Sequence, residues 1–420
     1  MVLLFWSEVV FVSGLVVVKF GGSVLSDELG VARATEWVKR LTERGLRVVV
    51  VVSALRGVTD ELLRSAQRLN PDASPEMLDE VLAMGERTSA RLFALSLARH
   101  GVESVVVDPS SSIWPVVTDG KHLDANPVLD ECRRRVETGL RKVLETGKVP
   151  VVCGYVGVAR GSGRITTMGR GGSDTTATLL ANCLDADEVI LVKDVSGVYS
   201  TDPKSSSEAS VIQVISSNEL MQLAVSGAKV IHPKALRYLG GRTKIRIGSL
   251  ESLMEDRGTL IIPSEKPDIE VDVTRDNLTI ATVLGEDLES PDRLGLITEV
   301  LKQAGARLVF LSIGEGFLTL CFDGNGEFVE TLHNKLVVSG LGKAVSHFPN
   351  LSMITISGKM LDTSPGVIHK VTQPLAAQAI NIYGAVTVGS TVRIFVSSKE
   401  ALKAKQLIMD ELRGMGDEAA

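Results

Sequence analysis

Two runs of apolar residues near the start of the chain limit what it can fold into. Leu15–Phe20 and Arg47–Ser53 are rich in valine and lack the polar alternation of a strand that faces water on one side. Strands of this kind are buried on both faces, as in parallel sheets covered by helices. Between them, Val31–Arg44 has apolar residues at helical spacing, and Gly45 stands where a C-terminal cap belongs. The sequence therefore predicts a strand–helix–strand unit.

Strand and helix signals continue to alternate through the first half of the chain. Apolar runs predict further strands at 104–107, 149–153 and 188–192, and helical spacing predicts helices at 87–99 and 175–184. This alternation is typical of an α/β protein with a mainly parallel sheet sandwiched by helices.

The pattern changes within residues 262–272, where Pro263–Pro267 is typical of a linker. Beyond this segment the order strand, helix, strand, strand occurs twice, about 70 residues apart. The repetition predicts two ferredoxin-like βαββαβ modules. We therefore predict a first domain at 1–265 and two modules at 266–348 and 349–420, with strand exchange between the modules left open.

Charge and cysteine content restrict the partners and the compartment. The formal net charge is −6, and acidic and basic residues are interspersed without a basic block. We therefore expect neither nucleic acid nor an anionic membrane as a partner. The four cysteines are too few for a disulfide scaffold, and their spacing is not that of metal ligands, so they predict buried thiols in a reducing compartment. They are Cys132, Cys153, Cys183 and Cys321.

The first residues of the chain are largely apolar and could suggest a secretion signal. No lysine or arginine precedes the apolar run, and Glu8 interrupts it. The run is also too short and too acidic for a membrane-spanning helix. We expect residues 1–14 to be an extension before the first strand, and the protein to be cytoplasmic.

A lysine and two glycines follow the first predicted strand. Lys19 ends the strand, and Gly21, Gly22 and Ser23 form the turn after it. In open parallel sheets, ligands bind beyond the carboxyl ends of the strands. Glycines let backbone N–H groups approach phosphate oxygens, and the lysine supplies charge. The alternative is a strand-end lysine followed by a flexible turn, because pairs of glycines are common. The segment is not a Walker loop, since the spacing of that motif is absent.

A second glycine-rich turn opens the helix predicted at 175–184. Arg170 can hold a carboxylate with two hydrogen bonds, and Asp174 can hold an ammonium group. The helix N-terminus attracts anions. The stretch Thr166–Ala177 therefore suits a zwitterionic amino acid, whereas a capped turn would not explain the arginine or the glycines.

Three further clusters carry weaker signals. Gly85–Ser89 precedes a predicted helix, where Glu86 could be a first-turn acid favoured by the helix dipole. Lys193–Lys204 forms a loop that offers an aromatic ring and polar groups to a nucleotide, or is a plain surface turn. Gly227–Pro233 holds a second lysine that could reach phosphates, or is a helix end, and its histidine suits a structural hydrogen bond better than catalysis.

Taken in order, these clusters resemble the aspartate kinase branch of the amino acid kinase family. The stretch Val52–Asp60 adds a further match, and the duplicated modules resemble the paired ACT domains of that branch. The resemblance covers the chain from about Leu15 onward. Its specific motifs are Gly169–Ala177 and Gly227–Pro233, whereas the Lys-Phe-Gly-Gly-Ser start is shared by the wider family.

The resemblance implies a role for each matched residue. Lys19 would stabilise the phosphoryl group in flight, Asp174 would orient the reaction centre, and both would be catalytic. Glu86 would take the amino group of aspartate, and Arg170 its α-carboxylate. The implied substrate-binding residues are Ser53, Thr59, Glu86, Arg170, Gly171, Gly172 and Ser173. The implied ATP-binding residues are Lys19, Gly21, Gly22, Ser23, Lys193, Asp194, Tyr199, Lys204, Lys229 and Val230.

The resemblance also implies an activity. The ATP γ-phosphate would pass to the β-carboxylate of L-aspartate to give 4-phospho-L-aspartate, the first step of lysine, threonine and methionine biosynthesis. Mg²⁺ would arrive with ATP, and no protein residue is assigned as its ligand. The ACT pair would support a homodimer or higher homo-oligomer, with lysine or threonine as a feedback effector.

Several departures from the branch leave other functions open. Gly21–Leu25 reads Gly-Gly-Ser-Val-Leu, which resembles acetylglutamate and uridylate kinases. Lys193 stands where a threonine is usual, and Lys204 where an arginine is usual. The alternatives are another enzyme of the family, such as an acetylglutamate or glutamate kinase, and a non-catalytic amino-acid sensor that uses only its ACT modules.

Overall fold

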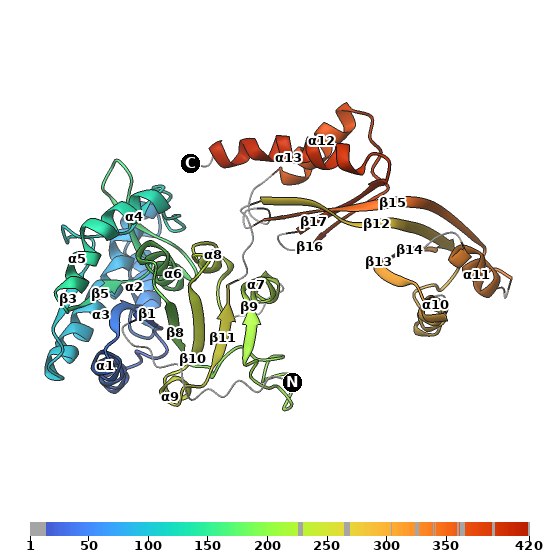
Figure 1. The fold of residues 1–420 in the computed structure, drawn as a ribbon. Coiled ribbons are helices and arrows are strands. Elements are labelled where there is room, and N and C mark those ends of the chain that lie inside the picture. Colours follow the sequence, from blue (N-terminus) through green and yellow to red (C-terminus); the bar gives the residue numbers. More distant parts are fainter. Residues whose placement is uncertain are drawn as a thin grey trace. The chain divides into compact units, whose positions relative to one another are not determined.

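A computed structural model describes most of the chain. The described residues are 14–225, 230–263, 269–303, 305–323, 327–338, 340, 342–358, 361, 366–388 and 391–418. The chain divides into two compact units, residues 1–265 and 266–420 (Figure 1). Each unit is described by itself below.

The first unit is built on an eight-stranded sheet. Its strand order is β3-β5-β2-β1-β8-β10-β11-β9, and among these neighbours β10 and β11 alone run antiparallel. The strands are β1 (Leu15–Phe20), β2 (Arg47–Val52), β3 (Ser104–Val107), β5 (Val149–Cys153), β8 (Glu188–Lys193), β9 (Val214–Ser216), β10 (Lys244–Ser249) and β11 (Thr259–Ile262). The mainly parallel sheet predicted from the sequence is confirmed.

Helices surround this sheet (Figure 1), and the unit also contains a small second sheet. The helices are α1 (Glu28–Glu43), α2 (Val58–Leu69), α3 (Pro75–Arg99), α4 (Leu129–Thr138), α5 (Leu140–Glu145), α6 (Gly172–Leu184), α7 (Ser217–Val225), α8 (Pro233–Arg237) and α9 (Leu250–Met254). The small sheet has the order β4-β6-β7, with β4 (Val117–Thr118), β6 (Val156–Ala159) and β7 (Ile165–Thr167).

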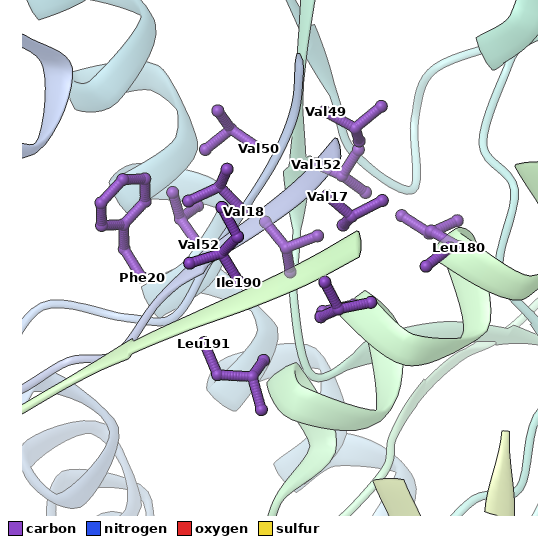
Figure 2. Packing of buried hydrophobic residues seen from close by; sticks show 14 of the residues in the cluster. Val17, Val18, Phe20, Val49, Val50, Val52, Val152, Leu180, Ile190 and Leu191 are labelled. Carbon is purple, nitrogen blue, oxygen red and sulfur yellow. The ribbon is translucent and has the colours of Figure 1, made fainter. Parts of the chain in front are cut away.

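The valine runs form the centre of the first core. Every residue of β1 is buried, and so is every residue of β2 after its first. Figure 2 shows Val17 and Val49 on the side of Leu180 of α6, and Val18 on the other side with Ile190 of β8. A strand at the centre of a parallel sheet has helices on both faces, which is why these runs contain no polar alternation.

One helix boundary was predicted wrongly. The sequence suggested a helix at 87–99, with Gly85 before it, but α3 begins at Pro75 and runs without a break to Arg99. Gly85 lies inside the helix because another segment approaches it closely: a Cβ there would lie 2.8 Å from the Cβ of Ala54. Glu86 is therefore a mid-helix residue and not a first-turn acid.

The second unit contains one six-stranded sheet with the order β13-β14-β12-β15-β17-β16. Its strands are β12 (Ile269–Leu284), β13 (Arg307–Gly314), β14 (Phe317–Asp323), β15 (Ala344–Gly358), β16 (Gly384–Val388) and β17 (Thr391–Ser397). Its helices are α10 (Pro291–Gln303), α11 (Glu327–Leu336), α12 (Val367–Ala377) and α13 (Ala401–Glu418). The sequence did not predict α11, which completes the first repeat.

The two long strands β12 and β15 each serve both repeats. Residues 278–284 of β12 pair with β14, whereas residues 269–275 pair with residues 353–358 of β15. The later part of β15 pairs in turn with β17. The second ferredoxin-like half is therefore completed by a segment that precedes the first half in the sequence. The domain boundary predicted at residue 348 stays a prediction.

Separate apolar clusters stabilise the two halves. Ala281 and Val283 of β12 pack with residues of α10 and α11, and Val271 packs with residues of α12 and α13. A third cluster contains Leu278 together with Phe395 of β17 and so joins both halves. The predicted linker residues 264–267 lie outside the described residues. Among those described, no helix is long and apolar enough to cross a membrane.

Candidate active site

Three neighbouring strands of the first unit deliver polar residues to one edge of its sheet. In the register of β1 with β2 and β8, Phe20 lies opposite Val52 and Val192. The residues that follow these strands are therefore side by side. The N–H of Ser53 donates to the carbonyl of Phe20 at 3.1 Å, and the N–H of Gly21 to the carbonyl of Val192 at 3.2 Å. Parallel topology thus brings together motifs that are far apart in the sequence.

A pocket of about 680 Å³ lies at this edge. Most of the predicted substrate and phosphate residues line it, and they come from β1, the residues that follow β1 and β2, helices α2 and α3, and the turn that opens α6. The predicted residues in its wall are Lys19, Gly22, Ser23, Ser53, Thr59, Glu86, Arg170, Gly171, Gly172, Ser173 and Asp174. One cavity therefore gathers side chains from several separate sequence clusters.

The carboxylate of Asp174, which lines the pocket, binds two ammonium groups. The Lys19 Nζ lies 2.7 Å from Asp174 Oδ1, and the Lys193 Nζ lies 2.7 Å from Asp174 Oδ2. Burial opposes ionisation of Asp174, but the two ammonium groups outweigh it and hold the pKa of the carboxyl well below its usual range. Burial lowers the pKa of Lys19, and the Asp174 carboxylate opposes that shift. With both lysines charged, the formal net charge of the three side chains is +1.

The turn before α6 places Asp174 in this cluster. Gly171 has a φ of 73° and is the N-cap of α6, so Asp174 lies in the first helical turn. Helix N-termini leave backbone N–H groups free and favour negative charge. The same turn presents Arg170, which is exposed and lines the pocket. An anion in the pocket would therefore meet an arginine, a helix N-terminus and Lys19.

Glu86 is a buried carboxylate in the wall of the pocket, with 3% of its surface exposed. Its Oε1 accepts a hydrogen bond from the N–H of Ala54 at 3.1 Å, and its Oε2 has no partner in the described part of the chain. Burial raises the pKa of Glu86 to about 7. An unpaired carboxylate oxygen of this kind is suited to a cationic ligand group.

Arg87, the residue after Glu86, anchors helix α3. Arg87 Nε donates to Asp108 Oδ2 at 3.1 Å, and Arg91 Nη2 donates to the same oxygen at 2.6 Å. Asp108 is 2% exposed and follows β3. The two arginines thus fix the middle of α3 against the sheet, which holds Glu86 in place.

The residues predicted to bind the nucleotide are less tightly grouped. Lys193 and Asp194 line a second cavity of about 410 Å³, and Ser23 borders both cavities. Tyr199 and Lys204 line neither of these two cavities.

Other residues predicted for the nucleotide are placed differently. The N–H of Gly21 donates a hydrogen bond to the carbonyl of Val192. Contacts to a phosphate at this turn are therefore left to Gly22 and Ser23. Lys229 lies outside the described residues. Val230 is half-buried and packs against the core.

Several lining residues were not predicted from the sequence. They are Ala54, Leu55, Arg56, Gly57, Asp60, Leu63, Leu123, Tyr155 and Gly169. The stretch 54–60 lies within a motif that the sequence had matched, so its proximity could have been inferred. Leu123 and Tyr155 have φ values of 64° and 67°, and no periodicity or motif in the sequence marks them.

Comparison with known proteins fits this geometry. Residues 14–249 match the model of the amino acid kinase family, and the chain belongs to this family. Over 404 residues it is 32% identical to an aspartokinase of Thermus thermophilus, covering 91% of this chain and 94% of that protein. The aspartate kinase branch predicted from the sequence motifs is thereby confirmed.

Solved structures give the same result for the fold. The aspartate kinase of Synechocystis matches with a TM-score of 0.73 at 25% identity, covering 94% of this chain and 69% of that one. E. coli aspartokinase III, in a crystal structure with aspartate and ADP, matches with a TM-score of 0.54 at 25% identity, covering 95% of this chain and 99% of that one.

Proposed function

We propose that this chain is an aspartate kinase, which transfers the γ-phosphate of ATP to the β-carboxylate of L-aspartate to form 4-phospho-L-aspartate. The observation that carries the proposal is one pocket lined by the Lys19–Asp174 ion pair and by Glu86 with its unpaired oxygen, with Lys193 bonded to Asp174 from the second cavity. The lysine of the ion pair suits a phosphate group, and the unpaired oxygen of Glu86 suits an amino group. The E. coli relative was crystallised with aspartate and ADP, the two kinds of ligand that this pocket would hold.

The reaction needs little proton transfer. The β-carboxylate of aspartate is ionised near neutral pH and is itself the nucleophile. It must approach a phosphate that is also negatively charged, so catalysis rests on alignment and charge neutralisation. Lys19 would neutralise the phosphoryl oxygens, and Asp174 would keep Lys19 and Lys193 in place for this task.

Two residues would hold the aspartate itself. Glu86 would accept the α-ammonium group through its free Oε2, and Arg170 would bind the α-carboxylate in a two-pronged manner. Ser53, Thr59 and the turn 171–173 would surround the side chain. With both ends of the substrate held, the β-carboxylate would point toward the phosphate.

The nucleotide would lie across β1 and β8. Gly22 and Ser23 would contact its phosphates, together with Lys193 and Asp194 from the second cavity. We assign Tyr199, Lys204, Lys229 and Val230 to the outer part of the nucleotide site, and Gly21 to the shape of the turn. Each of these assignments rests on the motif that contains the residue.

Mg²⁺ would be bound mainly by the phosphates of ATP. The buried carboxylate nearest to the phosphate site, Asp174, already pairs with two lysines. In the described part of the chain, no three histidine, cysteine, aspartate or glutamate residues form a group that could hold a metal ion. The exposed carboxylate of Asp194 borders the second cavity and could reach a water of the ion.

A second candidate is another carboxylate kinase of the family. Glu86 distinguishes the possibilities, because its buried oxygen calls for a cationic partner. N-Acetylglutamate has no free ammonium group and would leave this carboxylate unpaired. Glutamate has the ammonium group but is longer by one methylene.

The second unit supports a regulatory role. Two ferredoxin-like halves in one sheet are consistent with the ACT pair expected from the sequence. We propose a cytoplasmic enzyme that acts at the start of lysine, threonine and methionine biosynthesis. It would form a homodimer or a higher homo-oligomer through this unit, with lysine or threonine as effector.

A hydroxamate assay for acyl phosphate tests the proposal. The purified protein is incubated with Mg-ATP and L-aspartate, L-glutamate or N-acetyl-L-glutamate. We expect product with aspartate at least about tenfold above the other acids, a difference of about 1.4 kcal/mol in transition-state binding. Preference for another acid, or ATP-independent amino-acid binding without product, would overturn it.

The same assay tests regulation. We expect lysine, threonine or the two together to lower the rate with aspartate. A rate and a melting temperature that stay unchanged at saturating concentrations of both would reject feedback control by these amino acids while leaving the kinase activity in place.

A further inference from the structure

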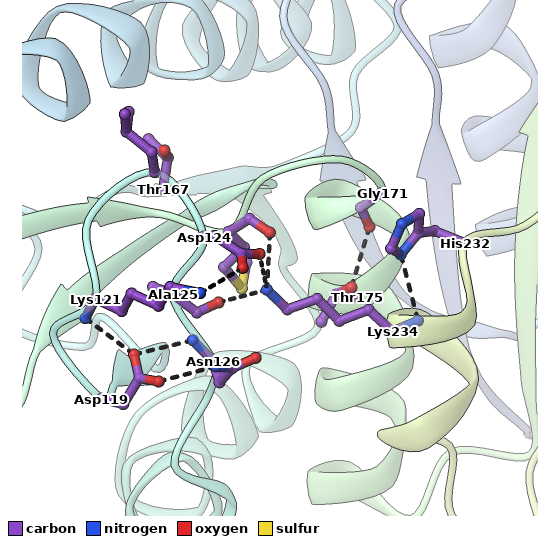
Figure 3. Close-up of polar contacts among 12 residues, drawn as sticks. Asp119, Lys121, Asp124, Ala125, Asn126, Thr167, Gly171, Thr175, His232 and Lys234 are labelled. Atoms are coloured by element: carbon purple, nitrogen blue, oxygen red, sulfur yellow. Dashed lines mark hydrogen bonds and ion pairs between the residues drawn. The ribbon is translucent and has the colours of Figure 1, made fainter. Parts of the chain in front are cut away.

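A buried lysine outside the pocket connects two segments of its wall. Lys234 of α8 is 5% exposed. Its Nζ donates to Asp124 Oδ1 at 3.0 Å, to the carbonyl of Ala125 at 2.8 Å and to the carbonyl of Met168 at 3.0 Å. Figure 3 shows the ammonium group reaching from α8 to the loop at Asp124 and Ala125.

These contacts use the full donor capacity of the side chain. An ammonium group has three N–H donors and no acceptor, and all three donors of Lys234 have a partner. Lys234 is also absent from the residues that line the pocket. It is therefore not a ligand of substrate or phosphate, and any effect on the reaction must pass through its partners.

The three acceptors belong to two segments that both reach the pocket. One is the loop between β4 and α4, in which Leu123 lines the pocket. The other is the end of β7, where Met168 directly precedes the turn that carries Arg170. The two segments also bond to each other, since the N–H of Ala125 donates to the carbonyl of Thr167 at 2.9 Å.

Both neighbours of Arg170 lie close to residues that form a hydrogen bond with Lys234. Gly169 and Gly171 have φ values of 68° and 73°. A Cβ at Gly169 would lie 3.1 Å from Asp124 Oδ1, and one at Gly171 would lie 2.3 Å from the Cβ of His232.

His232 itself belongs to the start of α8. Its Nδ1 accepts a hydrogen bond from the backbone N–H of Lys234 at 3.3 Å, as the N-cap of α8 (Figure 3). Asp124 on one side of Arg170 is thus bonded to the ammonium group of Lys234, whereas His232 on the other side is bonded to its backbone N–H, which a side-chain substitution leaves in place.

We propose that Lys234 is a positioning residue that fixes the arginine turn, and that it sets the affinity for the carboxylate of the amino-acid substrate without touching it. The inference rests on the proposed function, because it takes Arg170 as the group that binds the α-carboxylate. It assigns to α8 a role in amino-acid binding that its place outside the pocket does not suggest.

Removing the ammonium group would loosen the turn. Without it, the carbonyls of Ala125 and Met168 would be left buried without their donor. Unsatisfied buried acceptors are costly, so the loop and the turn would separate to reach water. Misplacement of a binding group by about 1 Å can lower the rate about 100-fold. Groups on the β1 and β8 side are not bonded to Lys234 and should keep their geometry.

Steady-state kinetics of three variants test the proposal. In Lys234→Met we expect the KM for L-aspartate to rise at least about tenfold and the KM for ATP to change less than about twofold. Lys234→Arg keeps the charge and should lie between the wild type and Lys234→Met. Lys121→Met is the matched control: Lys121 also pairs with Asp124, at 2.8 Å, but is exposed and is not bonded to Met168 in the described contacts. Its KM values should stay at the wild-type level.

The outcomes separate the inference from the function on which it rests. A wild-type protein that forms no acyl phosphate from aspartate refutes the proposed function. An active wild type with an unchanged aspartate KM in both folded Lys234 variants overturns the role of Lys234, as does an equal rise in both KM values. If Lys234→Met does not fold, Lys234→Arg decides alone: a selective rise in the aspartate KM supports the inference, and wild-type values refute it.

Discussion

The ammonium nitrogen of Lys193 lies 2.7 Å from Asp174 Oδ2. The carboxylate of Asp174 is buried and binds Lys19 through its other oxygen, Oδ1. Lys193 ends β8 and Lys19 lies within β1, which are adjacent parallel strands. Two cations of one sheet edge therefore depend on one acidic residue, and the first two predictions follow from that dependence.

Asp174→Asn should damage both stability and activity. The amide cannot balance two ammonium groups, which would then repel each other in a buried site. Breaking a buried ion pair by removing one partner costs about 3–5 kcal/mol. We expect a clear fall in the urea midpoint of unfolding and a loss of turnover. Wild-type values for both would show that Asp174 is not the support of the cluster.

Lys19→Ala should lower kcat by orders of magnitude, because Lys19 faces the proposed phosphoryl group. Lys193→Ala should reduce kcat less and raise the KM for ATP more, since Lys193 lies toward the second cavity. Near-normal turnover in a folded Lys19→Ala protein would rule out the catalytic assignment. Circular dichroism of both variants provides the control for folding.

Binding of the amino acid should improve as the pH rises through about 7. Burial raises the pKa of Glu86 to about 7, so its carboxyl is protonated in much of the free enzyme below that pH. Only the ionised form can pair with an ammonium group. The KM for aspartate should therefore fall between pH 6 and pH 8, and Glu86→Gln should raise it and flatten the profile. A wild-type profile that is flat over this range would contradict the assignment.

The same residue should affect stability in the opposite sense. The pKa of Glu86 is higher in the folded protein than the usual 4.5. Between these values the folded chain retains a proton that the unfolded chain has released, so stability is present at low pH and is lost as the pH rises toward 7. Compared with the wild type, Glu86→Gln should lose less stability between pH 5 and pH 8 in urea unfolding. An identical loss of stability in both proteins would show that Glu86 does not contribute to the pH dependence of stability.

Gly85→Ala should destabilise the protein although alanine favours helices. Its Cβ would lie 2.8 Å from the Cβ of Ala54, and overpacking of this kind costs about 1–3 kcal/mol. Gly295→Ala is the matched control, because Gly295 lies inside α10 with nothing within 4 Å of its Cβ position. That change should be neutral or stabilising by about 0.5–1 kcal/mol. Equal effects of the two changes on the melting temperature would disprove the packing argument.

Much of the fold could be predicted because its strands are buried on both faces. Continuous valine runs indicate β1 and β2 without ambiguity. The start of α3 was missed because a glycine that permits close packing looks like a helix break. The apolar spacing of Phe328, Leu332 and Leu336 could have indicated α11, which is helical from Glu327 to Leu336.

Site residues could be predicted where they stand inside a recognisable sequence motif. Lys19 and Arg170 stand close to glycines in recognisable turns. The pairing of Lys193 with Asp174 joins the end of β8 to the first turn of α6, a tertiary contact that a local pattern does not reveal. The role of Lys234 depends on three acceptors from distant segments. Such contacts follow from tertiary packing, so a motif search passes over them.

Strand β12 serves both halves of the second unit, and this has a consequence for folding during synthesis and for protein engineering. Arg275 and Met353 are paired neighbours although the whole first half of the second unit lies between them in the sequence. On the ribosome, residues 269–275 must wait for β15 before they gain a partner, so the half that begins first is completed last. The first half is in effect an insertion in one hairpin of its neighbour. A short turn joining these two positions would excise it and keep the β15–β17 pairs from Met353 to Ser357, at the loss of the pairs Leu351–Ser397 and Ser352–Val396.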